Sequence, residues 1–206
     1  MTHWVSIKRL LTPLGFACWI ILHSSCEQPE NKHIAPLMES QQKVSRGIAE
    51  LAVWHVDSVQ AAKARIEERF DDLDWLMPQE SLTKSPQDGP IIGDWSRAKR
   101  FLKDGPDRLV KLKIEGQLCL DQIDHLMTDI RSNVERDLEG TPIDEAYLKQ
   151  ATSKEIHAAN QFELAAQETS RLVRLGLELE QQARPSIDSL IRAKRAEWAQ
   201  QIAQDP

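Results

Sequence analysis

The sequence lacks several features that mark disulfide scaffolds, disordered chains and nucleic-acid binders. Its 206 residues include three cysteines and one tyrosine, and aromatic residues make up 5%. So few cysteines exclude a disulfide-dense scaffold, and 41% hydrophobic residues exclude a strongly disordered chain. Lys and Arg number 26 against 32 Asp and Glu, so the formal net charge is −6. Nucleic-acid binders usually carry a basic face, so we expect no nucleic-acid partner.

Local motifs for catalysis and cofactors are also missing. The sequence has no Cys-x-x-Cys-His haem-attachment motif, no glycine-rich phosphate loop, no His-Glu-x-x-His zinc motif and no Gly-x-Ser-x-Gly nucleophile turn. We therefore predict no catalytic residue, no cofactor and no enzymatic activity. Catalytic residues scattered along a chain leave no such signature, so this prediction concerns the local motifs alone.

Residues 1–25 contain no acidic residue and have the layout of a secretory signal. Lys8 and Arg9 precede an apolar stretch that extends to Leu22. This stretch is shorter than the roughly 20 residues that a membrane-spanning helix needs. A basic start, a short apolar region and small residues after it are typical of a signal peptide. We therefore predict that residues 1–25 are a signal peptide.

The end of this segment reads Leu22-His23-Ser24-Ser25-Cys26. It resembles the lipobox of bacterial lipoproteins, in which a Leu and two small residues precede a Cys; here the Leu lies one position early. The resemblance implies cleavage before Cys26 and lipid on its sulfur and on the new amino terminus. It also implies attachment to a membrane of the bacterial cell envelope, with the body in the periplasm or outside the cell. The alternatives are an ordinary secretory signal and an uncleaved apolar anchor.

The positions of the prolines predict an all-α fold. Proline inside a helix costs about 3 kcal/mol, so helices tend to lie between prolines. In the long proline-free stretches, apolar residues recur every three or four positions, which favours helices over strands. These stretches are residues 37–77, 107–141, 143–184 and 186–205.

The connections between these stretches predict how the helices are arranged. The three-residue link at 139–141 is short enough to make its two helices antiparallel. Residues 78–104 form a long connection rich in Pro, Gly and Ser, with a short helix at 94–103. Pro185 ends or kinks the third helix. The predicted fold is an elongated antiparallel bundle of three long helices plus a shorter C-terminal helix.

The predicted domain organisation follows from the signal and the bundle. After the signal peptide, residues 26–36 contain the lipidated Cys and a tether, and residues 37–206 form one helical domain. Cys119 is then the one cysteine left in that domain, so it has no intramolecular disulfide partner. It lies at the edge of an apolar stripe, which favours a buried thiol.

Three histidines in the predicted helices are candidates for a metal site: His55, His125 and His157. Asp121 and Asp129 lie four residues on either side of His125, on one helical face. This face could bind a metal if the first helix brought His55 alongside. The alternative is a hydrogen-bonded core histidine at position 55. Di-iron bundles need Glu-x-x-His repeats, which are absent, so we predict no metal site.

Three apolar residues around the long connection are candidates for binding a partner. Trp75 and Trp95 flank this connection, and Ile91 lies within it. The segment either completes the core or exposes these residues to a partner. We expect a membrane-anchored structural, scaffolding or interaction module that binds an envelope protein. The alternatives are a periplasmic binding or chaperone-like bundle and a metal-binding protein.

Overall fold

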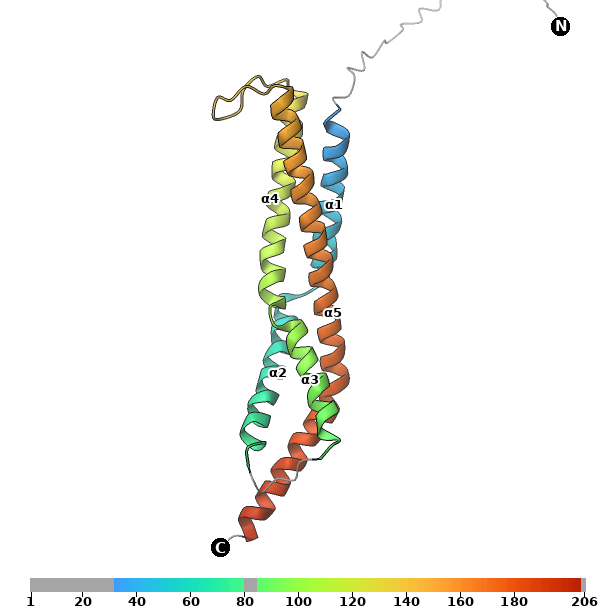
Figure 1. Ribbon diagram of the computed structural model, residues 1–206, viewed down its shortest axis with the longest axis vertical. Helices are drawn as coiled ribbons and strands as arrows, with labels where there is room; N and C mark the ends of the chain where they lie inside the picture. Colours follow the sequence, from blue (N-terminus) through green and yellow to red (C-terminus); the bar gives the residue numbers. More distant parts are fainter. Residues whose placement is uncertain (1–31, 80–84, 205–206) are drawn as a thin grey trace, which may run out of the picture. The chain divides into compact units, whose positions relative to one another are not determined.

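Five α-helices make up the part of the chain that the computed structural model describes, residues 32–79 and 85–204 (Figure 1). They are α1 (Ile34–Ala52), α2 (Val56–Leu76), α3 (Asp88–Leu102), α4 (Gly105–Arg131) and α5 (Glu145–Gln204). Within these ranges the only extended pairing is a single bridge between Arg136 and Pro142, in the α4–α5 connection. The prediction of an all-α fold is confirmed.

Helix α5 packs against all four other helices. α1 and α4 contact each other and the N-terminal part of α5, and we call this group the α1–α4 half (Figure 1). α2 and α3 contact each other and the rest of α5, and we call this group the α2–α3 half. Buried apolar residues from Ile34 to Ile191 form a single cluster. The two halves therefore share one helix and one core.

The predicted helix over residues 37–77 is wrong, because two helices occupy this stretch. α1 begins before residue 37, and Pro36 lies in its first turn, where the missing N–H costs nothing. The chain breaks between Ala52 and Val56, and His55 has an extended backbone with ψ of 115°. The indole of Trp54 donates to Ser170 Oγ at 2.8 Å, and Lys113 Nζ donates to the Trp54 carbonyl oxygen at 3.3 Å. Contacts with α5 and α4 therefore hold the break.

The predicted long connection at 78–104 is mostly helix. α3 starts at Asp88, six residues before the predicted short helix, and ends at Leu102. α4 follows after two residues, with Pro106 in its first turn, as the proline pattern predicts. Residues 80–84 lie outside the described ranges.

The link between α4 and α5 is longer than the predicted three residues, because α4 ends at Arg131. Asn133 and Gly140 have positive φ angles of 49° and 83°, and these residues turn the chain. The Asp137 carboxylate accepts hydrogen bonds from the backbone N–H groups of Glu139 and Thr141. The residues that were predicted to form the last turns of the helix therefore form hydrogen-bonded turns in this link.

The predicted separate C-terminal helix is also wrong, because α5 runs through Pro185 as one helix of 60 residues. Proline leaves the carbonyl group four residues earlier without its helical partner. Pro185 and Gln181 are both exposed, so water can hydrogen-bond that carbonyl. The helix bends in its C-terminal third, which contains this proline, rather than ending there (Figure 1).

Close packing in the α1–α4 half depends on Phe162. A Cβ atom added to Gly47 of α1 would lie 2.8 Å from the Phe162 ring, and one added to Gly116 of α4 would lie 2.6 Å from it. A contact below 3.0 Å would force neighbouring atoms to move, so there is no room for a Cβ atom between the ring and either α1 or α4. Glycine at these two positions therefore lets α1 and α4 approach the ring that α5 supplies.

Candidate functional site

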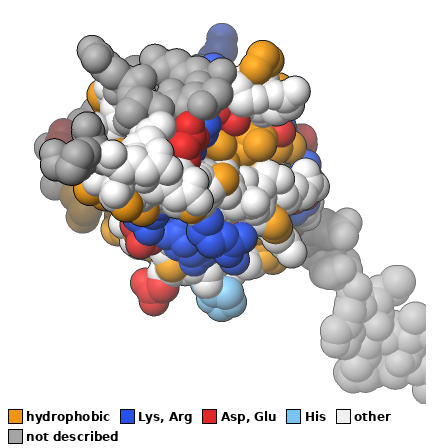
Figure 2. Space-filling model, turned by 90° about the horizontal axis from the view of Figure 1, so that it is seen from below, with side chains coloured by type: hydrophobic (Ala, Val, Ile, Leu, Met, Phe, Trp, Pro, Cys, Tyr) orange, Lys and Arg blue, Asp and Glu red, His pale blue; other side chains and the backbone are white. Residues whose placement is uncertain are grey.

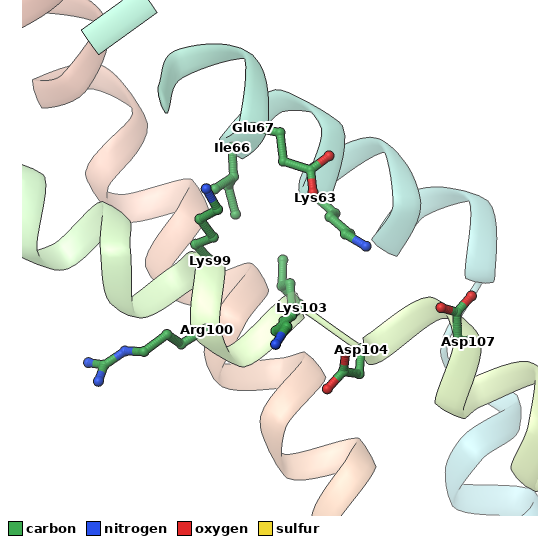
Figure 3. A pocket seen from close by; sticks show the side chains of 9 residues that line it. Lys63, Ile66, Glu67, Lys99, Arg100, Lys103, Asp104 and Asp107 are labelled. Atoms are coloured by element: carbon green, nitrogen blue, oxygen red, sulfur yellow. The ribbon is translucent and has the colours of Figure 1, made fainter. Parts of the chain in front are cut away.

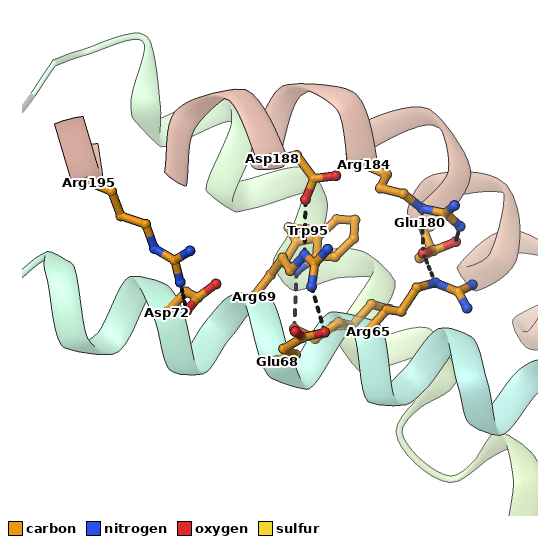
Figure 4. A network of polar contacts seen from close by, with 10 residues as sticks. Arg65, Glu68, Arg69, Asp72, Trp95, Glu180, Arg184, Asp188 and Arg195 are labelled. Carbon is orange, nitrogen blue, oxygen red and sulfur yellow. Dashed lines mark hydrogen bonds and ion pairs between the residues drawn. The ribbon is translucent and has the colours of Figure 1, made fainter. Parts of the chain in front are cut away.

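A network of charged side chains joins α2 to α5 (Figure 4). Glu180 of α5 is 2% exposed, and it accepts hydrogen bonds from Arg65 Nε at 2.9 Å and from Arg184 Nη2 at 2.6 Å. About one helical turn after Arg65 on α2, Arg69 Nε donates a hydrogen bond to Asp188 Oδ1 at 3.0 Å. A further pair, Arg195 with Asp72, lies beyond it. The network holds α2 in one orientation on α5.

The buried carboxylate of Glu180 is ionised because two arginines surround it. Burial raises the pKa of Glu180, but hydrogen bonds from Arg184 and Arg65 outweigh this effect and leave the pKa below its ordinary value. The hydrogen bond to Asp188 raises the pKa of Arg69. These groups are charged at neutral pH and paired with one another, as expected for contacts between helices.

A second buried ion pair joins α3 to α5. Lys194 and Asp88 are both buried, and Lys194 Nζ lies 3.4 Å from Asp88 Oδ2. The same Asp88 oxygen accepts a hydrogen bond from the Ser85 backbone N–H at 3.1 Å. Glu197 lies 3.6 Å from the ammonium group. The pair fixes the beginning of α3 against the end of α5.

A cavity of about 440 Å³ lies where α2, α3 and the start of α4 meet (Figure 3). Ile66 and Leu102 supply its apolar lining. Its other lining residues are all charged: Lys63, Glu67, Lys99, Arg100, Lys103, Asp104 and Asp107. Lys99 Nζ lies 4.3 Å from the centre of the Phe70 ring, a favourable cation–π distance. The lining therefore carries four cationic and three anionic side chains around two apolar residues that are themselves buried.

The α4 helix exposes a row of three large apolar side chains, which we call the α4 stripe. Val110, Ile114 and Leu118 are 47%, 58% and 56% exposed. A spacing of four residues places them along one face of the helix. Single exposed apolar residues are common on protein surfaces, whereas a continuous patch indicates an interaction site.

A groove of about 470 Å³ between α4 and α5 adjoins this stripe, and we call it the α4–α5 groove. Leu118 belongs to both features. The groove is lined by Leu112, Glu115, Leu118, Cys119, Gln122, Ala158, Gln161, Phe162 and Ala165. Its floor is apolar and its edges are polar, which is how a surface that receives an amphipathic helix is built.

The cysteine in this groove is a packing residue. Cys119 is buried, as its place on the apolar stripe predicts. Burial raises the pKa of its thiol, and the nearby Glu155 carboxylate raises it further. Reactive cysteines have a lowered pKa in a cationic surrounding, so this thiol has the opposite environment.

The structure does not bring the candidate metal ligands together. Among residues 32–79 and 85–204, no group of three His, Cys, Asp or Glu side chains could hold a metal ion. His55, His125 and His157 are all exposed, so the alternative of a core histidine at position 55 is also wrong. His55 is exposed because the break between α1 and α2 interrupts the stripe that would have buried it. Near His125, Asp121 accepts a hydrogen bond from Gln117, and Asp129 lies half-buried.

The candidate partner-binding residues have different environments. Trp95 is fully buried, and its indole donates to the Ile66 carbonyl oxygen at 3.2 Å, so it completes the core. Trp75 is 50% exposed and packs edge-on against Trp198 with ring centres 4.8 Å apart. Ile91 is half-buried. Contact with a partner stays a prediction for Trp75 and Ile91.

The predicted lipidation site and signal segment, Cys26 and residues 1–25, lie outside the described residues. The predicted tether at 26–36 is corrected at its end, because α1 already begins at Ile34. None of the helices in the described ranges is both long and apolar enough to cross a membrane.

Sequence reasoning missed the most distinctive polar residues and the α4 stripe. Glu180 and Lys194 are charged residues within a mostly polar helix, and nothing local marks them as buried. The α4 stripe did carry a signal, because Val110, Ile114 and Leu118 recur every four residues beside the predicted core stripe through Leu109 and Leu112. A second apolar row on one helix is the pattern of a helix with two buried faces.

Lys and Arg side chains also gather into one patch on the face of the body seen in Figure 2.

Comparisons of the chain with protein-family models, with curated proteins and with solved structures give no match.

Proposed function

We propose that this protein is a lipoprotein of the bacterial cell envelope whose helical body is an interaction module. Lipid on Cys26 anchors the chain, and the α4 stripe with the α4–α5 groove docks a helix. The observation that carries the proposal is the continuity of the two features through Leu118, which joins exposed apolar side chains to an apolar groove. The protein acts by binding, and no catalytic step is part of its role.

The energy available at this surface supports docking. Covering a large apolar side chain contributes about 1.5–3 kcal/mol relative to leaving it in water. Val110, Ile114 and Leu118 are each about half exposed, so part of this energy is unused in the single chain. α1 and α5 both pack against α4, and the α4 stripe stays exposed. A helix laid along α4 covers this stripe and reaches the α4–α5 groove at Leu118.

The anchor is tested by changing the cysteine. The Cys26→Ser variant should leave the membrane fraction and be recovered as an unlipidated chain, since several acyl chains are what hold the protein on a bilayer. The matched control is Cys119→Ser, which changes the buried cysteine of α4 and should leave lipidation unaltered. A wild-type protein whose mass shows an unmodified Cys26 contradicts the proposal.

The docking surface is tested with the anchor in place. The full chain carrying both Ile114→Glu and Leu118→Glu should stay helical and stay in the membrane, because both side chains face solvent. It should lose the chemical crosslinks that the wild-type protein forms in the envelope. Leu138→Glu is the matched control, because Leu138 is fully exposed in the α4–α5 connection, away from the stripe. Equal crosslinking by all three proteins contradicts docking at α4.

A further inference from the structure

We infer that the helix docked on the α4 stripe is the α4 helix of a second copy of this chain, running antiparallel to the first. This inference rests on the proposed function, because it uses the same surface and names what covers it. The distribution of charge along α4 favours this partner and this direction.

The two halves of α4 differ in net charge. The N-terminal half, residues 105–117, has three basic side chains, Arg108, Lys111 and Lys113, and two acidic ones, Asp107 and Glu115. The C-terminal half, residues 118–131, has three acidic side chains, Asp121, Asp124 and Asp129, and one basic one, Arg131. The first half is therefore net positive and the second net negative, so the helix is electrostatically complementary to itself when reversed.

Direction decides whether two such helices attract. In a parallel pair the net positive halves face each other and so do the net negative halves, which is unfavourable. In an antiparallel pair each net positive half faces a net negative half, and the favourable contact occurs twice. A two-fold dimer uses the same patch on both copies, so every such contact is repeated by symmetry.

The spacing of residues selects a register for this pair. Lys111 lies three residues before Ile114, and Asp121 lies three residues after Leu118. A two-fold axis midway between Ile114 and Leu118 therefore sets Ile114 of one copy level with Leu118 of the other. The same axis sets Lys111 level with the other copy's Asp121. Apolar contacts at the centre and ion pairs at the edges are the usual anatomy of an interface.

The present partners of these charged groups do not prevent the pairing. Lys111 Nζ lies 3.6 Å from Glu115 Oε1, and Asp121 accepts a hydrogen bond from Gln117 at 2.8 Å. All four residues are exposed. Exposed pairs on one helix contribute little, so they can be exchanged for contacts between copies.

Antiparallel pairing does not require the lipid anchors of the two copies to lie next to each other. α1 begins at the end of the α1–α4 half where α4 ends (Figure 1). The two α1 beginnings of an antiparallel pair therefore lie at opposite ends of the paired α4 helices. Association is consequently tested on the mature chain, residues 26–206, with Cys26→Ser, so that lipid does not bring copies together.

Sedimentation equilibrium of this chain should show a monomer–dimer equilibrium. Ile114→Glu and Leu118→Glu should each weaken dimerisation about tenfold or more, as expected for apolar residues at the centre of an interface. Leu138→Glu should leave it unchanged. Circular dichroism of each variant verifies that the helices are intact. A wild-type chain that is monomeric at every concentration overturns the inference.

A charge exchange tests the direction of the pairing. Lys111→Glu and Asp121→Lys should each weaken dimerisation several-fold, because each places like charges together at two symmetric positions. The double variant should recover the wild-type affinity. Glu115→Gln is the control for the loss of the Lys111 pair within one chain. A double variant that dimerises less well than either single variant contradicts the antiparallel register.

Different results would reject this inference and the proposed function. If the mature chain is monomeric but the full chain in its membrane forms crosslinks that Ile114→Glu/Leu118→Glu abolishes, a different protein occupies the surface. That result rejects the second copy and supports docking. If neither dimers nor stripe-dependent crosslinks form, both are rejected.

Discussion

The α1–α4 half and the α2–α3 half share helix α5 and one apolar core, but the buried Asp, Glu and Lys side chains of the described residues lie in the α2–α3 half. In the α1–α4 half, the Phe162 ring fits between two glycines, Gly47 and Gly116, and close apolar packing dominates. In the α2–α3 half, the buried charges of Glu180 and Lys194 pair with groups on α2 and α3. Each buried charge must face its partner, so these ion pairs add a constraint on which residues meet to the apolar contacts that both halves share.

The surfaces of the two halves also differ. The α1–α4 half exposes the α4 stripe, Val110, Ile114 and Leu118. In the α2–α3 half, the exposed aromatic Trp75 already has a partner in Trp198. The α2–α3 half thus offers a charged cavity, and the α1–α4 half leaves an apolar face for another helix.

The largest expected effect is the loss of the Phe162 ring. Phe162→Ala should lower the free energy of unfolding by about 3–5 kcal/mol, since the glycines on either side cannot fill the space. Urea unfolding followed by circular dichroism measures it. Leu164→Ala is the control, because Leu164 is exposed on the same helix and should cost less than about 0.5 kcal/mol. Equal losses in the two variants would contradict the packing described for the α1–α4 half.

The buried pair between α3 and α5 should give the next largest effect. Lys194→Met leaves the Asp88 carboxylate buried without its cation, and should cost about 3 kcal/mol. Replacing both residues, Asp88→Leu with Lys194→Met, should recover most of that loss because no charge is then left buried. The double-mutant cycle is measured by urea unfolding. A double variant as unstable as the two losses added together would show that the residues act independently.

A smaller, pH-dependent effect is expected at Glu180. Its pKa is lowered in the folded state, so the unfolded chain binds the proton more tightly and the contribution to stability is present above its unfolded pKa. That contribution is lost as the pH falls through the lowered pKa of the folded state. Glu180→Gln should therefore cost about 1–2 kcal/mol near neutral pH and less in acid.

The measurement is urea unfolding of wild type and Glu180→Gln at neutral pH and below about pH 4, the ordinary range for a carboxyl group. Glu178→Gln is the control, since Glu178 is exposed on the same helix. A difference between wild type and Glu180→Gln that is the same at both pH values would mean that Glu180 gains nothing from its charge.

Local pattern predicted which segments are helical, but not where contacts between distant segments interrupt or extend them. The stripe from Leu51 through His55 to Val59 predicts a single helix, whereas Trp54 bonds to Ser170, more than a hundred residues away, and the helix breaks. Pro185 predicts an end to helix, but its exposed position lets α5 continue. Both errors come from tertiary contacts and solvent exposure, which a local pattern does not contain.

The candidate site was less predictable than the fold. Arg65 and Glu180 meet across α2 and α5, although they are separated by 115 positions in the sequence. The sequence showed the two tryptophans that flank the long connection, but it did not show how far each is buried. Trp95 enters the core, whereas Trp75 remains half exposed. The α4 stripe was readable as an apolar row, and only the packing of α1 and α5 on the other side of α4 shows that this row is left uncovered.

The central claim, that the α4 stripe is occupied in the envelope, is tested most directly by photocrosslinking from position 114. A photoreactive amino acid is placed there in the full chain, and a matched chain carries it at position 138, where Leu138 is fully exposed. We expect an adduct from position 114 whose mass is twice that of the chain, and no adduct from position 138. The absence of any adduct from position 114, or equal adducts from both positions, would contradict the account.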